Sequence, residues 1–139
     1  MSDVEVRRAQ KTDLEHIAEI QAASPEASQW KPADYLHYET SVAAAGAEIF
    51  GFVSYRTVAP SEHELLNIAV SPSWRRQGIG RALIEKVRDA SPGTWFLEVR
   101  ESNRASRHLF ATLGFTEIGL RKEYYSNPFE SGIVMRFHS

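Results

Sequence analysis

Two closely spaced glycines lie in an arginine-rich segment, Ser71–Arg81, which reads SPSWRRQGIGR. Glycine lets the backbone turn tightly, so that successive N–H groups point into one concavity, and a helix N-terminus adds partial positive charge there. The side chains of Arg75, Arg76 and Arg81 bring further positive charge. The segment is suited to bind a pyrophosphate. The alternative is a plain strand-to-helix turn with solvated arginines.

Two familiar phosphate-binding loops do not fit this segment. A Walker A loop needs Gly-Lys-Ser/Thr after the glycines, whereas the chain has Gly78-Ile79-Gly80-Arg81. A Rossmann fingerprint needs a third glycine where the chain has Leu83, and an acidic residue on a following strand. The sequence therefore argues against an ATPase and against a dehydrogenase.

Carboxylates in two predicted strands are candidates for acid–base chemistry. Glu98 lies between two apolar residues, an odd place for a carboxylate unless it faces a cavity. Its structural alternative is an ion pair with Arg100, two residues along on the same face. Glu64 shares one face of its predicted strand with Leu66 and Ile68, which would let it enter a cleft, whereas His63 lies on the opposite face. For Glu64 the alternative is a solvated charge at the end of a strand.

The hydrophobic periodicity predicts the elements that position these groups. Strands are expected at residues 4–8, 41–45, 48–58, 64–70, 95–100, 115–120 and 133–137. Helices are expected from a Thr12–Glu15 capping box to Ser24, from Pro32 to Glu39, from Ile79 to Ser91 and from Ala105 to Leu113. The order β-α-α-β-β-β-α-β-α-β-β predicts an α/β (α+β mixed sheet) fold with helices on both faces and a parallel, right-handed crossover from Val70 to Trp95.

The composition is that of an ordinary globular domain. Sixteen Lys and Arg against 18 Asp and Glu give a formal net charge of −2, which argues against a nucleic-acid or membrane-surface protein. The absence of cysteine excludes disulfides, cysteine thiolate nucleophiles and thiolate metal sites. The N-terminal residues lack the apolar region of a secretory signal, and no apolar run approaches the roughly 20 residues that span a bilayer. We expect one domain over residues 1–139, located in the cytoplasm, without a metal.

The glycine-rich turn, Arg75-x-x-Gly78-x-Gly80 after Asn67–Val70, resembles the acetyl-CoA signature of the GNAT N-acetyltransferases. Downstream motifs are similar to those of the RimI-type protein N-terminal alanine acetyltransferases: Leu97-Glu98-Val99-Arg100, Asn103, Leu109-Phe110, Leu113-Gly114-Phe115 and Arg121-Lys122-x-Tyr124-Tyr125. The resemblance is strong over residues 62–125. It implies the GNAT fold, in which two central strands splay apart around acetyl-CoA, the cosubstrate.

The resemblance also implies how acetyl-CoA is held. Backbone groups of one strand segment would pair with the pantetheine arm: Ile68, Ala69 and Val70. The turn that would cradle the pyrophosphate consists of Arg75, Arg76, Gln77, Gly78, Ile79, Gly80 and Arg81. Asn103 would hydrogen-bond the pantetheine. Its structural alternative is the N-cap of the following helix.

The resemblance assigns Glu98 as the general base, acting through water, and Glu64 is a second candidate. The family has a tyrosine at position 110 that protonates the departing thiolate, whereas this chain has Phe110, which would pack beside the thioester without a proton to give. Tyr124 and Tyr125 would approach from the last loop, and Trp30 lies where the family builds its acceptor groove. For Trp30 a role in the core is the alternative.

The leading interpretation is an acetyl-CoA-dependent N-acetyltransferase acting on a protein or peptide N-terminus, with ribosomal protein bS18 as the first substrate to test. An α-amino group, with a pKa of about 7.7–8.0, needs less help from a base than lysine at about 10.4. Two alternatives stay open. One is acetylation of a small amine, amino acid or antibiotic. The other, which Phe110 favours, is a non-catalytic acyl-CoA-binding regulatory module.

Overall fold

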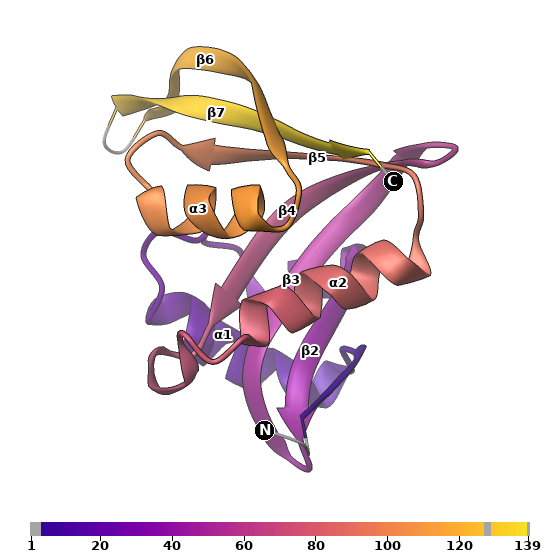
Figure 1. Cartoon of the computed structure of the whole chain (residues 1–139). Coiled ribbons are helices and arrows are strands. Elements are labelled where there is room, and N and C mark those ends of the chain that lie inside the picture. The colour runs from indigo at the N-terminus through magenta and orange to yellow at the C-terminus, as the bar shows by residue number, and fades with distance from the viewer. Residues whose placement is uncertain (1–3, 127–128, 139) are drawn as a thin grey trace. The chain divides into compact units, whose positions relative to one another are not determined.

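The computed structural model describes residues 4–126 and 129–138 (Figure 1). The chain divides into two compact units. The first contains the described residues up to Arg56 together with Leu65–Ser91, and the second contains Thr57–Glu64 and the described residues from Pro92 onward. Two strands, β3 (Glu48–Ala59) and β4 (Glu62–Val70), contribute residues to both units.

The elements follow the predicted order. In the first unit they are β1 (Glu5–Arg8), η1 (Lys11–Asp13), α1 (Leu14–Ala22), η2 (Pro32–His37), β2 (Glu39–Ala45), most of β3 and β4, η3 (Pro72–Trp74) and α2 (Ile79–Ala90). In the second unit they are β5 (Thr94–Arg100), α3 (Arg104–Thr112), β6 (Thr116–Ser126) and β7 (Phe129–His138). Within residues 4–126 and 129–138, no helix is long and apolar enough to cross a membrane.

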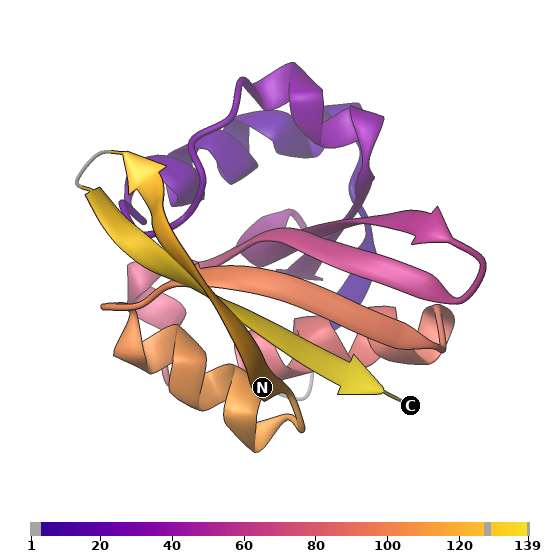
Figure 2. The ribbon, with the colours of Figure 1, turned by 90° about the horizontal axis from the view of Figure 1, so that it is seen from above.

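The first unit has strand order β1-β2-β3-β4, with β1, β2 and β3 antiparallel. Helices lie on both faces of these strands, with α1 and η2 on one side and α2 on the other (Figure 2). The α1 side buries a cluster that includes Ile17, Tyr35, Val42 and Phe52. The α2 side receives the apolar stripe of that helix, whose buried residues Ile79, Leu83, Ile84 and Val87 recur at helical spacing.

Close packing of α2 on the sheet depends on Gly51 in β3. A Cβ atom at this position would lie 2.9 Å from the carbonyl oxygen of Ala69 on β4. It would also lie 3.2 Å from Ile79 Cγ2 and 3.3 Å from Leu83 Cδ1. The missing side chain therefore lets the start of α2 and the end of β4 approach the same point on β3.

The second unit has strand order β4-β5-β7-β6. Glu62–Glu64 of β4 pair in parallel with Thr94–Phe96 of β5, which confirms the predicted parallel step. β5, β7 and β6 are antiparallel neighbours. On this sheet the ring of Phe115 lies 5.7 Å from Phe110 of α3 and 5.6 Å from Phe137 of β7, centroid to centroid. The splay of the central strands stays a prediction.

Several predicted element ends are wrong. The capping interaction is made by Gln10 and Asp13, because the backbone N–H of Gln10 donates to Asp13 Oδ2 at 2.7 Å and the first turn is a 3₁₀ helix that starts before the expected Thr12–Glu15 box. The second helix is also 3₁₀ and ends at His37, so that Glu39 begins β2. β6 and β7 extend much further than predicted, and Tyr124 and Tyr125 therefore lie in β6 rather than in a loop.

Candidate active site

The glycine-rich turn joins the end of β4 to the N-terminus of α2. Arg76 and Gly78 have φ values of +63° and +81°, both left-handed. Gly78 is the N-cap of the 12-residue helix α2, and a Cβ atom there would meet nothing within 4 Å. A backbone that alternates between left-handed and other conformations turns its N–H groups toward one side. The N-terminus of the helix adds positive potential at the same place. The turn therefore fits a phosphate group.

The other residues of the turn divide by exposure. Arg76, Gln77 and Arg81 are exposed, and Arg81 lies 3.8 Å from Glu85 one helical turn away. The side chain of Ile79 is 3% exposed and packs in the core, so only its backbone can reach a ligand. Gly80 is half-buried in the first turn of α2. Each predicted contact of these residues with the pyrophosphate stays a prediction.

The segment Ile68–Val70 at the end of β4 has two backbone groups already engaged. The side-chain oxygen of Asn67 accepts a hydrogen bond from the N–H of Ile68 at 3.1 Å. The carbonyl oxygen of Val70 accepts from Nε of Arg75 at 3.1 Å. Ala69 is 8% exposed, while its two neighbours are half-buried, as strand alternation predicts. A pantetheine arm that paired with this segment would therefore share or replace these bonds.

Trp30 packs against the core of the first unit. Its ring lies 4.8 Å from Tyr35 and 5.2 Å from Tyr38, centroid to centroid. Its backbone N–H donates to Oε1 of Gln21 at 3.1 Å, and its carbonyl oxygen accepts from Nε2 of the same residue at 2.9 Å. These contacts support the packing role of Trp30, and its predicted contact with the acceptor stays a prediction.

Glu98 is held by an arginine from another strand. Nη1 of Arg121 on β6 lies 2.5 Å from Oε1 of Glu98, and this bond raises the pKa of the arginine. The guanidinium of Arg121 also lies 4.2 Å from the ring centroid of Tyr124. The second carboxylate oxygen, Oε2, is buried and makes no hydrogen bond to any residue in the described ranges. A buried carboxylate oxygen without a partner is costly, so it marks a place for water or for a cationic ligand.

The strand register explains how this ion pair forms. Glu98 lies opposite Val134 of β7, and Arg121 lies opposite Gly132. Paired residues share a face, and residues two apart on β7 share a face as well. A Cβ atom at Gly132 would lie 3.3 Å from Tyr125 Cε2 and 3.4 Å from Tyr124 Cδ2, so the missing side chain makes room for these two tyrosine rings.

Arg100, the expected partner of Glu98, forms an ion pair with Glu130 on β7 at 3.2 Å. Glu130 also accepts bonds from the N–H of Ser102 at 2.9 Å and from its hydroxyl at 3.0 Å, and these bonds hold the pKa of Glu130 below its usual value. The guanidinium of Arg100 lies 4.4 Å from the ring centroid of Tyr125. Burial raises the pKa of Tyr125 to about 12, which makes this phenol a weaker proton donor.

Asn103 and Phe110 lie at opposite ends of α3. The side-chain oxygen of Asn103 accepts from the N–H of Ser106 at 3.2 Å, so the N-cap role is confirmed. The Nδ2 group takes no part in this cap, and its predicted bond to pantetheine stays a prediction. Phe110 is 3% exposed and meets Phe115 edge-on at 61°. The side chain at this position is therefore an apolar packing group.

His63 has a structural role. It is 5% exposed, its ring nitrogens lie 2.9 Å from the Thr57 hydroxyl and 3.2 Å from the carbonyl oxygen of Pro92, and its ring lies 4.9 Å from Trp95. Glu64 is half-buried and lies opposite Phe96 in the β4–β5 ladder. A catalytic role for Glu64 stays a prediction.

The candidate residues gather in two sets. The first unit contains Trp30, Ile68–Val70 and the turn from Arg75 to Arg81, and the second contains Glu64, Glu98, Asn103, Phe110, Tyr124 and Tyr125. Sequence reasoning assigned no role to Arg121, although it lies in a quoted motif, and it missed Glu130, for which no local signal exists. Among residues 4–126 and 129–138, no group of three or more His, Asp or Glu residues could hold a metal ion.

Two curated proteins are similar to this chain. N-alpha-acetyltransferase RimI of Mycobacterium tuberculosis is 30% identical over 137 residues, which covers 91% of this chain and 87% of the relative. The [Ribosomal protein bS18]-alanine N-acetyltransferase of Escherichia coli K12 is 43% identical over 84 residues, which covers 56% of this chain and 57% of the relative. In that match the chain spans little more than half the length of the curated relative.

A solved structure and a family match cover more of the chain. The crystal structure of the ribosomal-protein-S18-alanine N-acetyltransferase from Escherichia coli has a TM-score of 0.82 and 30% identity, and covers 97% of this chain and 93% of that one. Residues 6–115 match the acetyltransferase (GNAT) family. Together with the order of the elements, these matches show that the chain has the GNAT fold and belongs to the GNAT family of acetyltransferases.

Proposed function

We propose that this protein transfers the acetyl group of acetyl-CoA to the α-amino group of a protein or peptide N-terminus. The observation that carries the proposal is the state of Glu98, which has one oxygen paired with Arg121 and the other buried without a hydrogen bond to the described residues. A carboxylate held in this way is fixed in orientation and keeps one oxygen for a proton. Membership of the GNAT family supports acetyl-CoA as the donor.

In this proposal the first unit binds the donor. The turn from Arg75 to Arg81 would hold the pyrophosphate with backbone N–H groups, and Ile68–Val70 would pair with the pantetheine arm. Asn103 would hydrogen-bond the pantetheine through its Nδ2 group. Acetyl-CoA would supply an activated acetyl thioester, and the protein would supply position and proton transfer.

Glu98 would act as the general base. The acceptor arrives mainly as an ammonium ion near neutral pH, because an α-amino group has a pKa of about 7.7–8.0. Oε2 would take one proton, directly or through water, so that the neutral amine can attack the thioester carbonyl. The carbon–nitrogen bond then forms as the carbon–sulfur bond breaks, and the second proton lost from the nitrogen passes to the departing thiolate or to water. The CoA thiolate, whose parent thiol has a pKa of about 8.5, can leave without a dedicated acid at neutral pH.

The name of the Escherichia coli relative directs the choice of acceptor. A peptide that begins with the N-terminal alanine of ribosomal protein bS18 is the first acceptor to test, since that is the substrate in the relative's name. A ribosomal acceptor would place the protein in the cytoplasm. A small amine is the alternative acceptor.

Phe110 favours a second candidate function. Phenylalanine has no proton to donate, and here it is buried against Phe115. A protein of this fold that binds acyl-CoA without turnover would be a regulatory module rather than an enzyme.

One assay distinguishes these functions. Release of free thiol from acetyl-CoA is measured against peptides with free N-termini, the same peptides with blocked N-termini and an internal lysine, and small amines. Release only with free N-termini supports the proposal. Release with small amines supports the alternative acceptor, and acetyl-CoA binding without release supports the regulatory module.

A further inference from the structure

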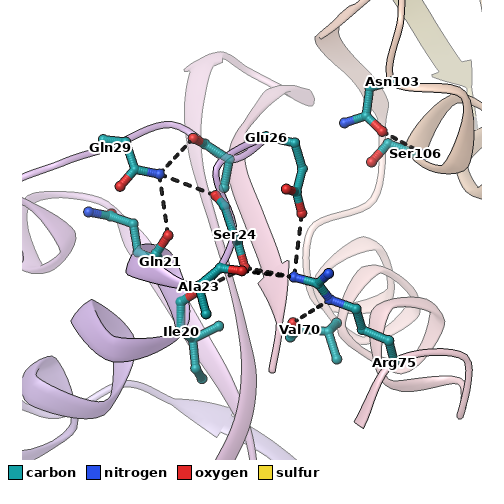
Figure 3. A network of polar contacts seen from close by, with 11 residues as sticks. Ile20, Gln21, Ala23, Ser24, Glu26, Gln29, Val70, Arg75, Asn103 and Ser106 are labelled. Atoms are coloured by element: carbon teal, nitrogen blue, oxygen red, sulfur yellow. Dashed lines mark hydrogen bonds and ion pairs between the residues drawn. The ribbon is translucent and has the colours of Figure 1, made fainter. Parts of the chain in front are cut away.

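Arg75 differs from the other arginines of the turn, because its side chain joins two elements of the first unit (Figure 3). Its Nε donates to the carbonyl oxygen of Val70 at 3.1 Å. Its Nη2 donates to the hydroxyl of Ser24 at 3.1 Å and to the carbonyl oxygen of Ala23 at 3.4 Å. The carboxylate of Glu26 lies 3.5 Å from the same nitrogen. The guanidinium therefore bridges the end of β4 and the residues that follow α1.

The acceptors of Arg75 suit a cation. α1 ends at Ala22, and the carbonyl groups at the end of a helix carry partial negative charge. The hydroxyl of Ser24 is fixed by its own bond to the carbonyl oxygen of Ile20 at 2.8 Å, so its lone pairs face the arginine in one orientation. The charge and most donors of Arg75 are thus already used within the protein.

A second bridge lies eight residues before Arg75, at Asn67. Its Oδ1 accepts from the N–H of Ser28 at 3.1 Å, and its Nδ2 donates to the carbonyl oxygen of Ser28 at 3.0 Å and to the hydroxyl of Tyr35 at 2.9 Å. Oδ1 also accepts from Ile68, as described above. Asn67 is 5% exposed, so these bonds are shielded from water.

The two bridges have a common geometry. Residues 23–31, which connect α1 to η2 and which we name the α1–η2 loop, are tied through Ser28 to the start of the segment Ile68–Val70. They are tied through Arg75 to its end. The same loop contains Trp30. The loop and the segment Ile68–Val70 are therefore linked by hydrogen bonds at two points.

We infer that Arg75 is a positioning residue that couples the acetyl-CoA segment to the α1–η2 loop, which contains Trp30, the residue expected on the acceptor side. The inference rests on the proposed function. It assigns the side chain of Arg75 to the α1–η2 loop, and leaves the charge near the pyrophosphate to Arg76 and Arg81.

The test compares Arg75→Met with Arg76→Met, using two acetyl donors. Acetyl-pantetheine lacks the pyrophosphate, so a residue that acts on the pyrophosphate affects only acetyl-CoA. Arg75→Met is expected to raise the KM for peptide about tenfold, the equivalent of one charge-assisted hydrogen bond. It should do so by the same factor with both donors and with a smaller change in kcat. Arg76→Met is expected to weaken acetyl-CoA alone.

Glu26→Gln and Ser24→Ala, each made in the wild-type and in the Arg75→Met background, complete a double-mutant cycle. Each should raise the KM for peptide in the wild-type background and have no further effect in Arg75→Met, because they act through the same guanidinium. If Arg75→Met fails to fold by circular dichroism, the two loop variants carry the test by themselves, and an unchanged KM for peptide in both overturns the inference.

Other outcomes separate this inference from the proposed function. An unchanged KM for peptide in folded Arg75→Met, or a loss confined to acetyl-CoA, overturns the coupling while wild-type turnover keeps the proposed function. Absence of turnover by the wild-type protein with every peptide and donor overturns both.

Discussion

Glu98 and Arg121 lie on strands that are not neighbours, yet their side chains form an ion pair of 2.5 Å over the strand between them. The pair fixes one carboxylate oxygen and leaves the other without a hydrogen bond in the described part of the chain. Holding a base in a single orientation favours proton transfer, because general bases act within hydrogen-bond reach of the proton they take.

Replacement of Glu98 by glutamine should lower turnover by about 10²–10⁴-fold without a large change in acetyl-CoA affinity. The loss should shrink at high pH, where the acceptor amine deprotonates unaided. The rate of thiol release across pH measures both effects. Glu101→Gln is the matched control, since Glu101 is an exposed carboxylate just beyond the same strand. Equal rates for wild type and Glu98→Gln near neutral pH would reduce Glu98 to the structural partner of Arg121.

Gly78→Ala and Gly46→Ala form a second matched pair. Both glycines have positive φ, +81° and +61°, and a Cβ atom at either would meet nothing within 4 Å. Each alanine should therefore cost about 1–2 kcal/mol of folding free energy through backbone strain alone. Only Gly78→Ala should also weaken acetyl-CoA binding, measured by calorimetry, because its Cβ would enter the space proposed for the pyrophosphate. Equal acetyl-CoA affinity in the two variants would rule out the phosphate turn.

Phe110→Tyr adds one hydroxyl at the position where the resemblance implies a proton donor. If protonation of the thiolate limits turnover, kcat should rise by at most about 10²–10⁴-fold, with little change in acetyl-CoA affinity because the ring contacts remain. A solvent isotope effect on kcat reports whether proton transfer is limiting. A marked fall in kcat with normal folding would show that the site needs an apolar group there.

Gly51→Ala should destabilise the protein by about 1–3 kcal/mol, the usual cost of overpacking. The added Cβ would lie 2.9 Å from the backbone oxygen of Ala69, which cannot swing away as a side chain can. Denaturant unfolding measures the change. Gly119→Ala is the control, because its nearest neighbour is Val134 Cβ at 4.0 Å, and its effect should stay within about 0.5 kcal/mol. Similar midpoints for both variants would contradict the close approach.

Asp13→Asn should remove part of the pH dependence of stability. Hydrogen bonds from Arg7 and from the N–H of Gln10 hold the pKa of Asp13 below its ordinary value of 3.8, so the unfolded chain takes up this proton more readily than the folded one. The stabilisation is complete above pH 3.8 and is lost as pH falls through the lower folded value. The variant should be less stable at pH 7 and have a shallower decline below pH 4. Denaturant unfolding at pH 7 and at successively lower pH values measures both effects.

Local patterns in the sequence predicted the elements well. Apolar residues recur at helical spacing from Ile79 to Val87, and apolar and polar residues alternate along β4. Both patterns follow directly from which side chains are buried, and the predicted helix and strand are confirmed. The 3₁₀ turns escaped prediction because Thr12–Glu15 and Pro32–Glu39 carry the same signals as an α-helix. The length of β6 also escaped, since Tyr124 and Tyr125 follow a run of charged residues without alternation.

The candidate site was harder to predict than the elements. Asn103 as an N-cap follows from its position before a helix, and it is confirmed. The partner of Glu98 does not follow from spacing, because it depends on the β5-β7-β6 order and on the register of these strands. The bridges at Arg75 and Asn67 join residues 51 and 39 positions apart, beyond the reach of any local pattern.

Part of β4 pairs with a strand that is synthesised much later, so its backbone hydrogen bonds cannot all form as soon as β4 itself has been made. Glu62–Glu64 pair with Thr94–Phe96, so this ladder waits until the whole of α2 has left the ribosome. The hairpin of β2 and β3 closes within a few residues and has no such delay. Because a contact between distant residues forms more slowly than a local one, the β4–β5 ladder is expected to form later than this hairpin. Until it forms, the start of β4 is an open strand edge in the nascent protein, and such an edge is a site at which chaperones bind or chains aggregate.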